Sequence, residues 1–357
     1  MVAMRSLVRR NIGALALAAL ALLSLVPAEA RADTESAVLV KYRVRVDQAV
    51  DRGLQFLAQN QAKNPAQDGS FTGQHGKTNA VVGLAGMAFL SKGYTPAAGP
   101  HSEPIRKCID YILSTPANDG YLGVRGGQMY SHAIATLFLS EVSGMVGPER
   151  QKRIDVVLPK ALKVILSAQS IQKVATNAGG WRYKPNSTSS DLSVTGWNLM
   201  ALRSARLNGA PVPVDAITKA VKYIDGCRDK ASGGFAYSQG GAGSPAMTAV
   251  GLLCRELAGH HGDDANLKAG EFLLKATRGK VFMPKGRSPY STYYASQAMF
   301  QLGDRYWDQF AVSMYEYLLP RQRANGSWRP MASRAYATAM YTLALGVSYR
   351  QLPIYQR

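Results

Sequence analysis

Cysteine is scarce in this chain, which has three among 357 residues and no Cys-x-x-Cys pair. Three cysteines cannot all pair, so a disulfide scaffold is excluded. Whether Cys227 and Cys254 pair with each other is left open by the sequence. A structural zinc site is not expected either, because no cluster of Cys and His has ligand spacing. The fold must therefore depend on a hydrophobic core, and hydrophobic residues make up 46% of the chain.

Acidic residues are also few, with 23 against 42 Lys and Arg and a formal net charge of +19. Two stretches lack them altogether, one between Glu271 and Asp304 and one from Glu316 to the C-terminus. A basic excess of this kind favours a polyanionic partner, and a generic solvated face is the alternative. For an exported protein we expect an anionic membrane or cell-envelope surface rather than nucleic acid.

Long apolar runs are absent after the N-terminus. The first thirty residues combine basic Arg5, Arg9 and Arg10, an uncharged apolar run over 12–26, and the small-x-small site Ala28–Ala30. This pattern predicts a signal peptide, 1–30, and export to the periplasm or the extracellular space after cleavage near Ala30. The alternative is an uncleaved anchor, but the run is shorter than the ~20 residues of a spanning helix.

The rest of the chain is built from a repeat. An aromatic or aliphatic residue followed by Leu or Ile recurs 45 to 59 residues apart, within segments of helical apolar periodicity. The six pairs are Phe56-Leu57, Tyr111-Ile112, Val164-Ile165, Tyr223-Ile224, Phe272-Leu273 and Tyr317-Leu318. A Gly-containing turn with an aromatic residue follows each pair, except that the fifth has Phe282 without Gly. The regular turns are Asp68–Phe71, Asp119–Tyr121, Gly179–Trp181, Gly233–Phe235 and Asn325–Trp328.

A second helix is expected after each turn. These segments are rich in Ala, Gly and Leu and apolar on most faces, which is typical of buried helices. They are 79–90, 131–142, 193–205, 246–257, 292–302 and 335–347. An open solenoid would expose them on its concave face, so the pattern favours a closed ring. We predict an all-α α/α toroid of six helical hairpins, with six inner and six outer helices. It forms one domain over 47–357, and 31–46 is a short N-terminal extension.

A Gln precedes the turn in three of the repeats. Gln61, Gln169 and Gln322 are followed by Gly69-Ser70-Phe71, Gly180-Trp181 and Gly326-Ser327-Trp328. This combination resembles the Gln-Trp repeat of squalene and other triterpene cyclases, which protein prenyltransferase β subunits share more loosely. The resemblance implies the toroid fold, with the Gln bonded to turn backbone and the aromatic packed on the outer helix. It says little about chemistry.

The catalytic residues of these cyclases carry over poorly. Cyclases that begin by protonation resemble one another in Asp-x-Asp-Asp-Thr at the mouth of an inner helix, and the nearest match is 191–195, Asp-Leu-Ser-Val-Thr. Ser193 stands where that motif has its proton donor, and a Ser hydroxyl is far too weak an acid to protonate an alkene. Asp191 is the one catalytic candidate left, and the alternative is a helix N-cap.

Metal-dependent chemistry has no matching motif. Asp263-Asp264 lacks the third Asp of the magnesium cluster found in the ionisation-type cyclases. Cys227, Cys254 and the pair His260-His261 do not match the Asp, Cys and His that hold zinc in the prenyltransferases. We expect no metal and no cofactor.

Ligands in such a ring would bind where the turns lead into the inner helices. The candidate residues at those positions are an aromatic set with a few polar groups: His75, Lys77, Tyr130, His132, Asp191, Trp197, Tyr290, Tyr293, Tyr294, Arg334 and Tyr336. They suit an apolar ligand with one polar head, such as an isoprenoid. The alternative is that these rings plug the centre, which would exclude a lipid substrate there.

Three functions are consistent with the sequence. The first is a protein like the terpenoid cyclases or prenyltransferases that binds or acts on an isoprenoid lipid. The second is a secreted, non-catalytic binding or scaffold module that uses a basic face. The third is a glycan-acting enzyme of toroid fold, which requires paired carboxylates.

Overall fold

The computed structural model describes residues 36–62, 68–73, 75–114, 116–277, 289–329 and 333–356. The expected signal peptide, 1–30, and the degenerate turn with Phe282 lie outside these residues. The chain divides into a short unit, Met1–Val40, and a large unit, Lys41–Arg357. The large unit carries the repeats and is described below.

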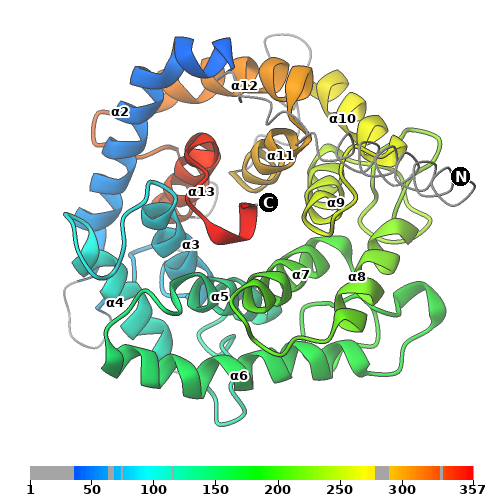
Figure 1. Ribbon diagram of the computed structural model, residues 1–357, viewed down its shortest axis with the longest axis horizontal. Helices are drawn as coiled ribbons and strands as arrows, with labels where there is room; N and C mark the ends of the chain where they lie inside the picture. The colour runs from blue at the N-terminus through cyan, green and yellow to red at the C-terminus, as the bar shows by residue number, and fades with distance from the viewer. Residues whose placement is uncertain are drawn as a thin grey trace, which may run out of the picture. The chain divides into compact units, whose positions relative to one another are not determined.

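Two concentric layers of helices make up the large unit (Figure 1). The outer helices are α2 (Ala37–Asn60), α4 (Ser102–Leu113), α6 (Pro148–Ser170), α8 (Val214–Gly226), α10 (Asp264–Thr277) and α12 (Asp304–Leu318). The inner helices are α3 (Asn79–Leu90), α5 (Gln128–Val142), α7 (Leu192–Leu207), α9 (Pro245–Leu257), α11 (Pro289–Leu302) and α13 (Arg334–Leu345). Short 3₁₀ helices are η2 (Ala175–Asn177), η3 (Leu319–Arg321), η4 (Gly346–Tyr349) and η5 (Pro353–Tyr355). The predicted alternation of outer and inner helices is confirmed.

The inner helices form a closed ring. Each packs against the next, and α13 packs against α3, so the last repeat meets the first. Nearly every residue of α3 is buried, and the other inner helices are similarly enclosed. Small residues permit this close packing, because a Cβ on Gly86 of α3 would collide with the Phe138 ring of α5. The toroid predicted from the repeats is therefore correct.

In three of the repeats, Gln and aromatic residues tie one hairpin to the following one. Gln169 Nε2 donates to the carbonyl of Gly179 in its own turn, at 2.8 Å, and to that of Ala216 in the next outer helix, at 2.9 Å. Trp181 packs on the outer helix that precedes it and donates from Nε1 to the Ile165 carbonyl at 2.8 Å. These contacts are the structural role that the Gln-Trp resemblance implied.

The same contacts join the last repeat to the first. Gln322 Nε2 donates to the Gly326 carbonyl at 2.9 Å and to the Ala49 carbonyl of α2 at 2.8 Å. Gly326 has φ +84 and lies so close to the carbonyl of Arg52 that a Cβ could not be accommodated. A left-handed conformation and a close backbone approach both require Gly here. Ring closure thus repeats an interaction already used within the chain.

Aromatic side chains fill the interior of the inner ring. Trp197 on α7 stacks on Tyr293 of α11, with ring centroids 5.5 Å apart and an interplanar angle of 7°. Tyr294 meets the same indole edge-on at 5.2 Å. Helix α9 lies between α7 and α11 in the ring order, so these side chains meet across the interior rather than between neighbours. Aromatic side chains of α7 and α11 thus meet across the interior of the ring.

The three cysteines are free and buried, so Cys227 and Cys254 are not paired. Over the described residues, every helix is too short or too polar to cross a membrane.

Candidate functional site

The mouth of the ring is the end where the inner helices begin. Four of these helices start at a Ser, Thr or Asp whose side chain accepts a backbone N–H of the first turn: Thr78, Asp191, Ser244 and Ser333. Asp191 Oδ1 accepts from the Val194 N–H at 2.9 Å. The capping role considered for Asp191 is thus one that Ser or Thr performs in other repeats.

Asp191 also begins a short hydrogen-bonded chain that leads toward the mouth. Ser193 Oγ donates to Asp191 Oδ1 at 2.6 Å and lies 2.5 Å from the Tyr130 hydroxyl. The second carboxylate oxygen is buried without a hydrogen bond to any described residue, and Arg182 Nε is 3.9 Å away. Burial raises the pKa of Tyr130, so its hydroxyl stays protonated and can donate. The arrangement offers polar groups to a ligand but no strong acid.

A surface of two tyrosines and one arginine lies beside this chain, and we call it the tyrosine rim (Arg182, Tyr183 and Tyr237). The two hydroxyls are 2.5 Å apart. Arg182 Cζ lies 5.1 Å from the centroid of the Tyr183 ring and 5.7 Å from that of Tyr237. Tyr183 is 37% exposed and Tyr237 38%, which is more than any other Phe, Trp or Tyr in the described part of the chain. An aromatic pair with a cation between its rings is a surface suited to binding.

The backbone holds the tyrosine rim in place. The Tyr183 carbonyl accepts the Met129 N–H at the start of α5, at 3.0 Å, and the Tyr237 carbonyl accepts the Leu192 N–H at the start of α7, at 2.9 Å. Both tyrosines come two residues after a turn aromatic, in the third and fourth repeats. Each therefore lies over the beginning of the preceding inner helix, and the rim rests on rigid elements.

The structure separates the predicted aromatic residues into two groups. Trp197, Tyr293 and Tyr294 are buried in the interior. Tyr130, Tyr290 and Tyr336 are half-buried at the mouth. Burial raises the pKa of Tyr290, and the electrostatic influence of Tyr130, Tyr336 and Asp191 raises it further, which is consistent with the three mouth tyrosines lying near one another.

His132 does not reach the mouth. Its Nδ1 accepts the Leu122 N–H at 3.0 Å, and its Nε2 contacts the Ala161 carbonyl of α6 at 3.0 Å. Both ring nitrogens are therefore used between the inner and outer layers. Burial lowers the pKa of His132 to about 4, which leaves the ring neutral near pH 7. The remaining polar candidates are exposed: His75, Lys77 and Arg334.

The tyrosine rim was not among the residues singled out from the sequence. The signal that could have found it is the recurrence of Tyr at one offset, in Gly180-Trp-Arg-Tyr183 and Gly234-Phe-Ala-Tyr237. As for a metal, the described residues contain no group of three or more His, Cys, Asp or Glu placed to hold one.

Comparison with known proteins establishes the fold. No family model and no curated protein matches this sequence. Among solved structures, the type II terpene cyclase MstE from Scytonema is similar, with a TM-score of 0.58 and 14% identity over 87% of this chain and 99% of that one. The α-1,6-mannanase GH76A from Salegentibacter sp. HEL1_6 has a TM-score of 0.62 and 12% identity over 85% and 99%.

Two complexes of these neighbours show what they bind. An MstE variant contains its substrate geranylgeranyl dihydroxybenzoate, with a TM-score of 0.55 and 13% identity over 88% of this chain and all of that one. An inactive variant of the mannanase contains α-1,6-mannotriose, with a TM-score of 0.61 and 11% identity over 85% and 99%. The chain thus has the α/α-toroid fold. The two neighbours with this fold act on different ligands, one on an isoprenoid compound and the other on a glycan. At such identities the fold alone is shared.

Proposed function

We propose that this protein is an exported, non-catalytic glycan-binding protein and that the tyrosine rim carries the binding. The supporting observation is the exposed pair Tyr183 and Tyr237 with Arg182 between the two rings. Tyr presents a large apolar face to the carbon skeleton of a sugar and a hydroxyl to its polar groups. The Tyr130–Ser193–Asp191 chain next to the rim supplies further hydrogen-bond donors and acceptors.

The carboxylate arrangement is the reason for proposing binding without hydrolysis. A glycosidase needs two carboxyl groups on either side of the scissile bond, roughly 5–10 Å apart. Asp191 is committed to the cap of α7 and to Ser193, and its contacts are with donors rather than with a second carboxylate. Three further turn carboxylates also have partners: Asp119 accepts the Tyr121 N–H, Asp229 accepts from Ser232 and Gly243, and Asp68 forms an ion pair with Lys107 at 3.3 Å.

Isoprenoid binding is the second candidate, and we place it at the mouth. The stacked Trp197 and Tyr293 occupy the interior, which argues against a polyprenyl chain within the ring. The half-buried Tyr130, Tyr290 and Tyr336 favour a shorter apolar ligand at the entrance. The substrate of the neighbouring cyclase, a geranylgeranyl compound, makes this the relevant chemistry to test.

Export is part of the proposal and rests on the N-terminal pattern of residues 1–30. Removal of 1–30 takes away Arg5, Arg9, Arg10 and Glu29, so the exported chain keeps a formal net charge of +17 and would also be attracted to anionic envelope surfaces. Such attraction is long-ranged and weakens with salt, whereas stacking on the rim does not. Salt dependence thus separates surface adsorption from binding at the rim.

The test is calorimetric titration of the purified mature chain with soluble oligosaccharides, including α-1,6-mannotriose, at 0.15 and 0.5 M salt. We expect saturable binding, little salt dependence, and no release of shorter sugars. Tyr183→Ala and Tyr237→Ala should each weaken binding by roughly tenfold, because each removes one stacking face. The matched control is Tyr317→Ala on α12, which removes a tyrosine that also carries an arginine, Arg321, over its ring at 4.2 Å.

Two results would contradict the proposal. Cleavage of any oligosaccharide would show an enzyme instead. Equal loss of binding in the Tyr317 control and the rim variants would remove the rim as the site. Titration with a geranylgeranyl alcohol in the same assay tests isoprenoid binding at the mouth. If the mouth binds an isoprenoid, Tyr336→Ala should lose binding and Tyr317→Ala should keep it.

A further inference from the structure

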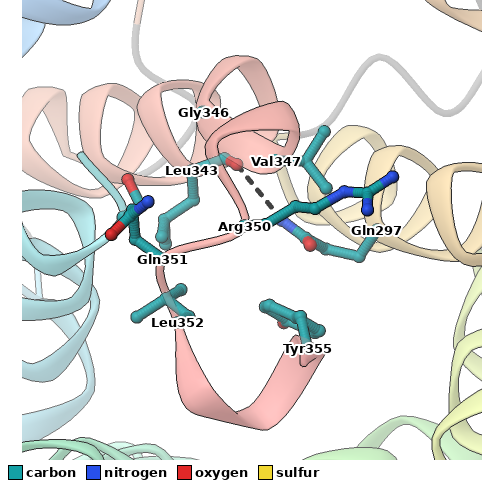
Figure 2. A pocket seen from close by; sticks show the side chains of 9 residues that line it. Gln297, Leu343, Gly346, Val347, Arg350, Gln351, Leu352 and Tyr355 are labelled. Atoms are coloured by element: carbon teal, nitrogen blue, oxygen red, sulfur yellow. Dashed lines mark hydrogen bonds between the residues drawn. The ribbon is translucent and has the colours of Figure 1, made fainter. Parts of the chain in front are cut away.

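The C-terminal segment (Gln351–Gln356) lies in the middle of the inner ring in the view of Figure 1. It contacts α5 and α11 near their C-terminal ends, whereas the tyrosine rim contacts the starts of α5 and α7. Arg350 has φ 53, in the left-handed region, and marks the turn from η4 into this segment. Leu352 and Ile354 are buried, and Tyr355 is half-buried. Figure 2 shows the segment next to α13, with Leu352 and Tyr355 beside the pocket that Gln297 and Arg350 also line.

The inner ring recognises this segment through polar contacts from two of its helices. The Ile354 N–H donates to Glu141 Oε2 on α5 at 3.3 Å. Gln301 Nε2 on α11 donates to the Tyr355 carbonyl at 2.9 Å. The Tyr355 hydroxyl is bonded to that of Tyr293, also on α11. Two of the three bonds are to the backbone of the segment, as in peptide recognition.

Glu141 is itself held for this task by the neighbouring inner helix. Ser204 on α7 donates its hydroxyl to Glu141 Oε1, while Oε2 accepts from the segment. The carboxyl group is fully buried, and no cation is among its partners in the described residues. Burying a carboxyl group costs free energy unless its oxygens accept hydrogen bonds. Glu141 Oε2 therefore needs the peptide N–H as its partner.

Ring closure does not use the C-terminal segment. The ring is closed by α13 against α3 and by Gln322 and Gly326 against α2, all before Arg350 in the chain. A small pocket of about 10 Å³ lies between the segment and residues of α11, α13 and η4. Gln297 lines that cavity and donates to the Leu343 carbonyl at 3.1 Å, while its buried Oε1 has no partner among the described residues (Figure 2).

We propose that the end of the inner ring between α5, α7 and α11 is a peptide-binding site, and that the C-terminal segment occupies it reversibly. The ligand class is an extended apolar peptide with the pattern Leu-Pro-Ile-Tyr, whose Ile N–H reaches Glu141 and whose Tyr reaches Tyr293. The segment behaves as a ligand attached by η4, and it can leave without opening the ring. This site is distinct from the tyrosine rim, so the two proposals stand or fall separately.

The protonation of Glu141 gives the site a pH dependence. Burial raises the pKa of Glu141 to about 7 and outweighs the hydrogen bonds from Ser204 and Ile354, which lower it. The other ionisable groups that act here are Tyr355 on the segment, Tyr293 on α11 and Cys254 on α9, and burial raises all of their pKa values. These three stay neutral from pH 5 to 8, so Glu141 alone titrates. Release of the segment hydrates Glu141 and favours its ionised form, so binding strengthens at low pH.

The experiment uses the mature chain ended after Arg350 and a fluorescein-labelled peptide of residues 351–357, followed by fluorescence polarisation. We expect the shortened protein to melt cooperatively and to bind one peptide saturably, and the full chain to bind none. Affinity should be about tenfold higher at pH 6 than at pH 8, for a Glu141 pKa that falls from about 7 to its ordinary 4.5 on release. Glu141→Gln should remove this pH dependence. A peptide N-methylated at the Ile354 nitrogen should bind at least tenfold more weakly.

A shortened chain that is folded and does not bind the peptide overturns the proposal, as does binding that ignores N-methylation. If the shortened chain does not fold, the same question is put to the full chain by native-state hydrogen exchange. The Ile354 amide should then exchange through a local opening, well before the amides of α5 and α7. Exchange of Ile354 only through global unfolding overturns the proposal equally.

Discussion

Replacing Glu141 with Gln isolates the effect of one buried carboxyl group on the stability of the ring. Glu141 is fully buried and bonded to Ser204 and to the Ile354 N–H. Gln has the same shape, can accept from the Ile354 N–H through its oxygen, and can donate to Ser204 through its amide. It cannot ionise, so the difference between the two proteins reports the charge.

The magnitude follows from the pKa. Burial raises the pKa of Glu141 from 4.5 to about 7 in the folded protein. Between these values the folded state binds more protons than the unfolded state, so stability falls as pH rises. The contribution is fully present below pH 4.5 and lost as pH passes through 7. Each unit of pKa shift corresponds to about 1.4 kcal/mol, which gives a loss of about 3 kcal/mol by pH 8.

Urea unfolding of both proteins at pH 5, 6, 7 and 8 provides the measurement. Other titrating groups change both proteins alike, so the difference in unfolding free energy isolates Glu141. We expect Glu141→Gln to gain about 3 kcal/mol relative to the parent between pH 5 and pH 8, most of it below pH 7. A difference that stays constant with pH would refute a carboxyl group whose pKa is raised by burial.

Three further predictions concern the ring itself. Gly326→Ala should cost at least 2 kcal/mol more than Gly209→Ala in urea unfolding, as an order of magnitude, because both glycines have positive φ but only Gly326 lies against backbone, the Arg52 carbonyl. Equal costs would contradict the close approach. Gln322→Ala and Gln169→Ala should each cost about 2–3 kcal/mol, since each removes two hydrogen bonds, one to a turn carbonyl and one to a carbonyl of the next outer helix. A negligible cost for Gln322 alone would mean that the ring is open there. The three buried thiols should react with a thiol reagent only after denaturation, and fast labelling of the native protein would contradict their burial.

The architecture was predictable because the residues that recur in each repeat have a clear physical role. A turn glycine must meet the next outer helix, and a Gln must satisfy the turn carbonyl, so both recur at fixed offsets. The inner helices were recognisable from their small and apolar residues. The first residue of α3 was predicted correctly, and those of the other five inner helices were predicted one to three positions too late.

The site was harder to predict because neighbouring residues on a helix face different directions. Tyr130 and His132 are two residues apart, which is about 200° around α5, so one lies at the mouth and the other against α6. Tyr183 and Tyr237 lie in loops without periodicity, and their exposure depends on contacts with other repeats. The C-terminal segment is too short to show a hydrophobic pattern. Its position depends on Glu141, and nothing in the sequence distinguishes this residue from other helical residues.

We propose the tyrosine rim as the binding surface of a toroid that does not cleave its ligand. Hydrogen–deuterium exchange of the mature chain, with and without saturating oligosaccharide, tests this most directly. We predict slowed exchange in the loops around Arg182, Tyr183 and Tyr237 and at the starts of α5 and α7, with intact oligosaccharide recovered afterwards. Protection confined to other faces of the ring, or recovery of cleaved sugar, would contradict it.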